Sequence, residues 1–529
     1  MNPFKRFFQV SASPTLPGAQ RRQGPQPFDV ADLYRGPVTT GTEAGGEATA
    51  CDEKLRKAYF WIANHAIINP FHDIAFNDRP PTTFAFGDSK VPVELPTEQS
   101  YSSYILLPLL TLVLRRRCLL VGGPGRGKTA IAVLMGRIAG YGLDEVRRGI
   151  QHGHPQMTVA DLLGNPLPAS LMKAETGDEI RVAWRRWLGM RVKVIDEYNR
   201  IPTRTQSALL TVLADGYAEM YDQLYQCPES AWYLTANDDA GGGTYQVIEA
   251  LRDRIDVVVK ALHFNSRFLD ELLTRVEEGV RPEEAVPGEI IFTQEELDRA
   301  AREIRAVPMP TPLLRRLAFF TSQFELCEPA ARQIDYLTKD TVKSSGVDLA
   351  ALIEGQTGLD RLAELGMQTL NGLSVRALMT ALAYCKAMAW FRGGSEVAYA
   401  DLVQVLPFVL HDKLAQHAEA RVFSTGDGAA LRSDRVTWIR RLFDAACAEY
   451  DRLDRDHDDP AAAMLDEFAR GLDGVDEKTA RARLTAIERQ LRLWTEGRKL
   501  NGHLFDDVLA LKYLHQRYTN YLRWLTWRR

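Results

Sequence analysis

The sequence predicts an α/β protein in which helices enclose a parallel β-sheet, followed by an all-α region, with further helical regions at both ends. Three observations support this fold class. A short apolar run, residues 119–121, leads through a glycine-rich stretch into a helical run that begins at Lys128. Two later apolar runs end in polar residues at Asp196 and Asn237, as buried parallel strands often do. In the second half of the chain, apolar residues recur at the three- and four-residue spacing of helices.

Composition is that of an ordinary globular protein. The 529 residues are 45% hydrophobic and 25% charged, and this length suggests three or four domains. The net charge of -4 gives the chain no general attraction to nucleic acid. No apolar run approaches the 18 residues of a membrane-spanning helix, so we expect no membrane span.

The cysteines and the N-terminal segment favour a cytoplasmic location. Residues 1–30 are basic and aromatic but have no apolar core, which predicts a disordered leader rather than a signal peptide. The cysteines lie far apart without a C-x-x-C pair, which suits reduced thiols and argues against a zinc ribbon. They are Cys51, Cys118, Cys227, Cys327, Cys385 and Cys447.

The stretch GGPGRGKT has the spacing of a phosphate-binding loop. The pattern G-x-x-x-x-G-K-[ST] lies between an apolar strand and a helix, the context that the motif requires. Its glycines let successive N–H groups face a phosphate, and the helix adds its positive N-terminal end. Lys128 would reach the β/γ-phosphates and Thr129 would hold Mg²⁺. The alternative is a glycine turn with a solvated lysine, which the flanking strand and helix disfavour. The candidate ATP-binding residues are Gly122, Gly123, Pro124, Gly125, Arg126, Gly127, Lys128 and Thr129.

Polar residues end the two later strands. In VKVIDEYNR, Asp196 could order the Mg²⁺ shell and Glu197 could polarise the attacking water. An acidic strand end that caps the next helix is the alternative. In SAWYLTAND, the amide of Asn237 could hold the water near the γ-phosphate, unless it only forms a turn.

Two arginines follow in EALRDRID. An arginine at this place could act on a neighbouring subunit's nucleotide, and we place Arg254 ahead of Arg252 for that role. His152 and His154 could bind a metal, although a loop or buried role is the simpler interpretation.

Together these segments resemble the AAA+ ATPases and, within them, the MoxR family. The resemblance covers about residues 97–414 and also includes GLSVRALMTALAYCKAMAWFRG. It implies an AAA+ P-loop αβα sandwich with a helical lid. The roles that it implies are Walker A for Lys128 and Thr129, Walker B for Asp196 and Glu197, sensor 1 for Asn237, the arginine finger for Arg254 and sensor 2 for Arg376. A solvated arginine in a first helical turn capped by Ser374 is the local alternative for Arg376.

The expected domains follow from these motifs. They are an N-terminal extension at 1–96, the ATPase core at 97–268, a helical lid at 269–415 with an insertion near 325–366, and a helical C-terminal region at 416–529. Two hairpins are expected in the core, one around 173–187 with an ETGD turn and one in YAEMYDQLYQ. Trp184 and Trp187 of the first hairpin could anchor a partner, or could pack in the core.

The resemblance also implies a function. It implies a homo-oligomeric ring, most simply a hexamer, that uses ATP and Mg²⁺ to remodel, assemble or activate a partner protein, such as a von Willebrand A domain protein or a metalloenzyme. The alternative is a nucleic-acid motor or a restriction or defence subunit, which the net charge and the lack of a nucleic-acid module disfavour. One of the unmatched ends could also carry a separate binding function.

Overall fold

The computed structural model describes residues 50–77, 79–87, 92–174, 180–237, 249–279, 281–354, 365–424, 426–472 and 474–527. The expected leader and the ETGD turn lie outside these ranges. The chain forms two compact units, and the first combines Met1–Pro308 with Met379–Val409. The second combines Met309–Leu378 with Leu410–Arg529, so the chain passes between the units three times. No helix in the described ranges has the length and apolar character needed to cross a membrane.

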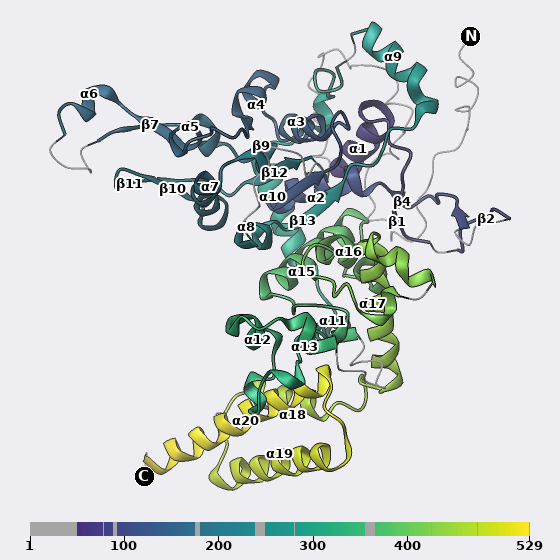
Figure 1. Ribbon diagram of the computed structural model, residues 1–529, viewed down its shortest axis with the longest axis vertical. Coiled ribbons are helices and arrows are strands. Elements are labelled where there is room, and N and C mark those ends of the chain that lie inside the picture. Colours follow the sequence, from purple (N-terminus) through teal and green to yellow (C-terminus); the bar gives the residue numbers. More distant parts are fainter. Residues whose placement is uncertain are drawn as a thin grey trace. The chain divides into compact units, whose positions relative to one another are not determined.

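A five-stranded parallel sheet organises the first unit (Figure 1). The strand order is β13-β5-β12-β9-β6, so the strand before the glycine-rich loop lies inside the sheet. Its strands are rich in apolar residues because both faces are covered. Their bounds are β5 Arg117–Val121, β6 Gln151–His152, β9 Val192–Asp196, β12 Ala231–Ala236 and β13 Val257–Lys260.

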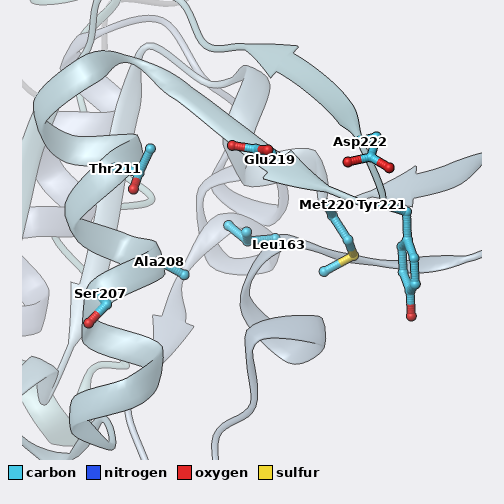
Figure 2. Close-up of a pocket in the computed structure, with 8 residues that line it drawn as sticks. All are labelled: Leu163, Ser207, Ala208, Thr211, Glu219, Met220, Tyr221 and Asp222. Atoms are coloured by element: carbon cyan, nitrogen blue, oxygen red, sulfur yellow. The ribbon is translucent and has the colours of Figure 1, made fainter. Parts of the chain in front are cut away.

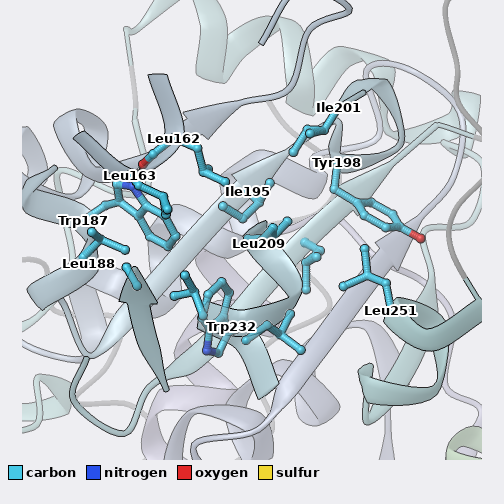
Figure 3. Close-up of a cluster of buried hydrophobic side chains, with 14 of the residues drawn as sticks. Leu162, Leu163, Trp187, Leu188, Ile195, Tyr198, Ile201, Leu209, Trp232 and Leu251 are labelled. Carbon is cyan, nitrogen blue, oxygen red and sulfur yellow. Dashed lines mark hydrogen bonds between the residues drawn. The ribbon is translucent and has the colours of Figure 1, made fainter. Parts of the chain in front are cut away.

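Strand alternation sends neighbouring side chains into different layers. On one face, Tyr233 of β12 donates its hydroxyl hydrogen to Pro108 O of α2 (Ser103–Leu114), 2.9 Å away. On the other face, Trp232 and Leu234 join a core that includes Leu209 of α7 (Thr203–Asp215) (Figure 3). Helices therefore cover both faces, and the predicted αβα sandwich is confirmed.

The remaining helices of the first unit vary in length. The N-terminal region forms α1 and a π-helical turn, Ile62–Ala66, which fits the helical region expected before the sheet. The bounds are α1 Cys51–Trp61, α3 Lys128–Ile138, α4 Leu143–Gly149, α5 Val159–Leu163, α6 Pro168–Leu171, α8 Glu249–Arg254, α9 Leu269–Glu277, α10 Gln294–Ala306 and α16 Tyr399–Leu410.

Within the described ranges, four small antiparallel pairs accompany the main sheet. They are β1 Ile74–Ala75 with β4 Ser100–Tyr101, β2 Thr83–Ala85 with β3 Pro92–Glu94, β7 Gly164–Pro166 with β8 Val182–Trp184, and β10 Tyr217–Met220 with β11 Gln223–Gln226. The hairpin predicted in YAEMYDQLYQ is confirmed by β10 and β11. In the region of the other, β8 pairs with residues 164–166, which precede the expected bounds of 173–187, and the expected ETGD turn is not among the described residues. The β10–β11 turn places Tyr221 and Asp222 at φ angles of 50° and 57°, the left-handed values of a tight hairpin turn.

Of the two alternatives left open for Trp184 and Trp187, the structure supports core packing for Trp187. That side chain is 1% exposed and donates its indole N–H to Leu162 O at 2.7 Å. Its ring also meets Trp232 edge-on at 5.8 Å (Figure 3). Trp184 is half-buried and lies 5.6 Å from the Tyr225 ring. The Trp187 side chain therefore packs in the core of the first unit.

The second unit is helical. Trp438, Leu442 and Ala446 are buried along one face of α17, as their spacing predicts. The insertion region contains short helices, as expected, and residues 355–364 of it lie outside the described ranges. Helix α15, Val375–Phe391, begins in this unit and ends in the first. The other bounds are α11 Thr311–Ser322, α12 Lys339–Ser345, α13 Leu349–Glu354, α17 Arg435–Arg452, α18 Pro460–Ala469, α19 Glu477–Gly497 and α20 Gly502–Trp527.

Candidate nucleotide site

The glycine-rich loop lies at the carboxyl end of β5 and leads directly into α3, which begins at Lys128. Gly122 has a φ of 155°, and a Cβ there would lie 2.6 Å from Ala261 O. Only glycine fits that close approach. Arg126 donates to the same Ala261 carbonyl at 3.0 Å, while its own carbonyl accepts from Tyr104 Oη at 3.1 Å. These contacts fix both ends of the loop.

The ammonium group of Lys128 is held inside the loop. Its side chain is buried, and Nζ donates to Gly122 O at 2.6 Å and to Gly123 O at 2.8 Å. It also donates to Asn237 Oδ1 at 2.9 Å. The residues predicted for the cradle and for the β12 tip therefore converge on one charge. Phosphate oxygens could accept the same hydrogen bonds, and a charged acceptor would make them stronger.

Asp196, at the carboxyl end of β9, accepts hydrogen bonds from two threonine hydroxyl groups. Its Oδ1 accepts from Thr129 Oγ1 at 3.0 Å and from Thr235 Oγ1 at 2.5 Å. Mg²⁺ prefers oxygen ligands and is usually bound by one or two protein groups with phosphates and water. Thr129 and Asp196 fit that ion. Among the described residues, no group of three or more His, Cys, Asp and Glu could hold a metal alone.

The backbone of Glu197 adopts a left-handed conformation with a φ of 52°, which is uncommon for a residue with a side chain. Its N–H donates to Thr235 Oγ1 at 2.9 Å, which holds the turn. Its carboxylate accepts from Asn237 Nδ2 at 2.9 Å and lies 3.2 Å from Arg200 Nη1. Gly153 approaches closely from β6, because a Cβ there would lie 2.3 Å from Glu197 O. Asn237 and Arg200 thus position the carboxylate, while Thr235 and Gly153 constrain the Glu197 backbone.

A cavity of about 510 Å³ adjoins the loop at Arg126 and Gly127. Apolar side chains of distant segments, including Ile67, Leu134 and Phe264, line it. Its volume and lining suit a purine ring placed beside a phosphate loop. Burial raises the pKa of Tyr104, another lining residue, so the phenol stays neutral.

The predicted arginines differ in how far the structure describes them. Arg254 ends α8 and is half-buried, whereas the side chain of Arg252 lies outside the described part. Arg376 is exposed in the first turn of α15 and belongs to the second unit. His152 Nδ1 lies 3.3 Å from Asp196 Oδ2. His154 is exposed.

Sequence reasoning missed Thr235, Arg200, Gly153 and Tyr104. Thr235 precedes Asn237 by two residues on a strand, so alternation could have placed both on one side. Nothing in the sequence signals the approach of Gly153 to Glu197, because it depends on how two strands are spaced.

Residues 117–257 match the family model described as "ATPase family associated with various cellular activities (AAA)". They form an AAA ATPase domain. The loop, the β9 tip and the β12 tip all lie within this matched segment. The protein is an ATP-hydrolysing enzyme, and the AAA ATPase domain is its nucleotide-binding part.

No curated protein matches the chain. A similar solved structure is that of a proposed ATPase from Cytophaga hutchinsonii ATCC 33406, with 19% sequence identity and a TM-score of 0.44. The match covers 63% of this chain and 88% of that one.

Proposed function

We propose that the protein is a MoxR-type AAA+ ATPase that works as a homo-oligomeric ring, most simply a hexamer, in the cytoplasm. It would couple ATP hydrolysis with Mg²⁺ to the remodelling, assembly or activation of a partner protein. A von Willebrand A domain protein and a metalloenzyme are the partner classes to test first. The expected domain ranges remain part of this proposal.

One observation carries the proposal. Lys128 donates to Asn237, and Asn237 donates to Glu197, so a continuous hydrogen-bonded path joins the phosphate loop to the candidate base. A change at the γ-phosphate would therefore alter the hydrogen bonds of both Asn237 and Glu197. This supports Glu197 as the group that polarises water and Asn237 as the group that senses the phosphate.

The mechanism assigns one task to each group of the chain. Lys128 and the loop N–H groups bind and orient the phosphates, and Thr129 and Asp196 would hold Mg²⁺, which supplies charge neutralisation when bound. Glu197 accepts a proton from the attacking water, and Asn237 restrains that carboxylate. Arg254 would stabilise the transition state at a neighbouring subunit's site, and Arg376 would contact nucleotide from the lid.

A mixing experiment tests the ring. Arg254→Ala should bind ATP and hardly hydrolyse it, since arginine fingers contribute on the order of 10³–10⁵ in rate in GTPases. Mixing Arg254→Ala with Lys128→Ala should restore part of the activity, because each variant supplies what the other lacks. Full activity of the wild-type protein as a proven monomer would refute the trans role.

The hairpins are the candidate partner contacts. A pocket of about 470 Å³ lies between α7 and the β10–β11 turn (Figure 2). Tyr221 and Leu224 on this hairpin are 45% and 68% exposed. Replacing both by alanine should preserve basal ATPase activity and abolish stimulation by proteins that co-purify with Glu197→Gln. Unchanged stimulation would remove the hairpin from the mechanism.

The nucleic-acid alternative makes an opposite prediction. A nucleic-acid motor would show ATPase activity that rises with added DNA or RNA at low salt. We expect no such rise in ATPase activity, because a net charge of -4 gives the chain no general attraction to nucleic acid. A large rise that is lost in high salt would replace the protein-remodelling proposal.

A further inference from the structure

A second polar cavity of about 390 Å³ lies at the opposite edge of the sheet from the nucleotide site. It is lined at the amino ends of β5, β9 and β12, at Arg117, Lys193 and Trp232. The nucleotide site lies at the carboxyl ends of the same strands. A five-residue strand separates the two edges by roughly 15 Å, so one ligand cannot fill both sites.

Lys193 is buried in the wall of this cavity without a carboxylate partner. Its side chain is 1% exposed, and Nζ donates to Ser230 Oγ at 2.7 Å and to Met190 O. No carboxylate lies within 4.0 Å of its nitrogen in the described residues. The ammonium group lies over the Trp232 ring, 5.6 Å from its centroid, which is near the outer limit of cation–π attraction. Two neutral acceptors leave one of the three ammonium hydrogens without an acceptor.

Another buried lysine shows how a fully satisfied ammonium looks in this chain. Lys339 in the second unit is also 1% exposed. Its Nζ donates to Gly366 O at 2.6 Å, Thr369 O at 2.8 Å and Thr369 Oγ1 at 2.7 Å. All three hydrogens are used there. Lys193 differs by one missing acceptor and by its place on a cavity wall.

Further unmet donors and charges line the same cavity. Arg117 Nε is buried and has no acceptor within the described part of the chain, although the other nitrogens of this guanidinium donate to Asp256 and to Leu213 O. Arg305, at the end of α10, lines the cavity and is exposed, with no carboxylate within 4.0 Å among the described residues. Arg115 is paired with Glu229 and Asp298, so it contributes no free charge.

We propose that this cavity binds a small tetrahedral oxyanion of the phosphate class, free or as a phosphomonoester, through the charges of Lys193 and Arg305, with Arg117 Nε as a further donor. Guanidinium and ammonium groups are the side chains that bind such anions most strongly. The anion would supply the acceptor that Lys193 lacks and a charge for Arg305. Burial lowers the pKa of Lys193 to about 8, and a bound anion would raise this pKa again because it favours the charged ammonium.

The test separates this cavity from the nucleotide loop. All proteins carry Lys128→Ala, so that phosphate cannot report on the loop. Calorimetry and thermal unfolding are measured with inorganic phosphate, and with sodium chloride at matched ionic strength. We expect phosphate to bind, and to raise the unfolding temperature of the first unit by about 3–5 °C at a hundredfold excess over its Kd.

Two variants then remove the site. Lys193→Met should abolish phosphate binding, yet unfold without phosphate at the same or a higher temperature, because an unpaired buried charge has been removed. Arg305→Gln, at an exposed position, should weaken phosphate binding about 5–10-fold without affecting folding. Arg302→Gln, one turn earlier on α10 and also exposed, is the matched control and should bind normally.

Each outcome either supports the anion site or overturns it. Phosphate also stabilises proteins as a general salt effect, so an equal temperature rise in the Lys193→Met variant and its parent would overturn the site. A Lys193→Met protein that is destabilised without phosphate would show a purely structural lysine. Binding of glucose 1-phosphate but not of phosphate would identify a phosphomonoester as the ligand and support the same site.

Discussion

Replacing Gly153 by alanine should slow ATP hydrolysis while leaving ATP binding intact. The added Cβ would lie 2.3 Å from Glu197 O and 3.0 Å from Glu197 C. Carbon and oxygen normally approach no closer than about 3.3 Å, so the Glu197 backbone must move by about 1 Å. A displacement of this size at a catalytic group can lower the rate about 10²-fold. Lys128 and the loop are not displaced, so nucleotide affinity should change little.

Steady-state ATPase assays and binding of a labelled ATP analogue measure the two quantities separately. Gly142→Ala is the matched control, because a Cβ at Gly142 meets nothing within 4 Å and its φ of -62° suits alanine. We expect this control to retain normal turnover. A Gly153→Ala protein with wild-type kcat would refute the idea that the position of the Glu197 backbone limits hydrolysis.

Three further predictions concern the cradle, the core and a buried lysine. Lys128→Ala should lose ATP binding in a filter-binding assay. Glu197→Gln should bind ATP but not hydrolyse it, and normal turnover by this variant would disprove the role of Glu197 as the base. Trp187→Ala should lower the free energy of unfolding by about 3–5 kcal/mol in urea denaturation, because a buried indole and its hydrogen bond to Leu162 O are lost; a loss below about 1 kcal/mol would contradict its place in the core. Burial lowers the pKa of Lys339 to about 7, from 10.5 in the unfolded chain, so the unfolded state holds more protons between these values. Stability of the second unit should therefore rise with pH through that window, and Lys339→Met should remove this rise; an unchanged pH slope would show that the lysine is not desolvated.

The sequence predicted those parts of the site that lie at strand ends. Val121, Asp196 and Asn237 each end or follow an apolar run, and parallel strands bring their carboxyl ends to one edge. The loop motif adds a prediction of where a phosphate would bind. Local chemistry and a simple topological rule were sufficient for these residues.

Contacts between distant segments were beyond sequence reasoning. The cavity beside the loop combines Ile67 with Phe264, and no local pattern joins segments so far apart. The sequence left the role of Trp187 open for a related reason, because an aromatic residue near a hairpin can face solvent or the core with the same spacing. Which face it takes depends on Trp232 and Leu162, which come from other elements.

The way in which residues 379–409 complete the first unit limits how this protein can be divided. Tyr384 is fully buried, with its hydroxyl 2.7 Å from Thr111 Oγ1, and Thr380 donates to Asp256 Oδ1 at 2.6 Å. A fragment that stops at residue 308 would lack both side chains and expose the surface of α2 that they cover. The ATPase domain therefore cannot be obtained as a stable fragment by truncating the chain at one point. Exchanging it between proteins by recombination at a single boundary would leave its core incomplete. Any functional minimal version must retain a second, later piece of the chain.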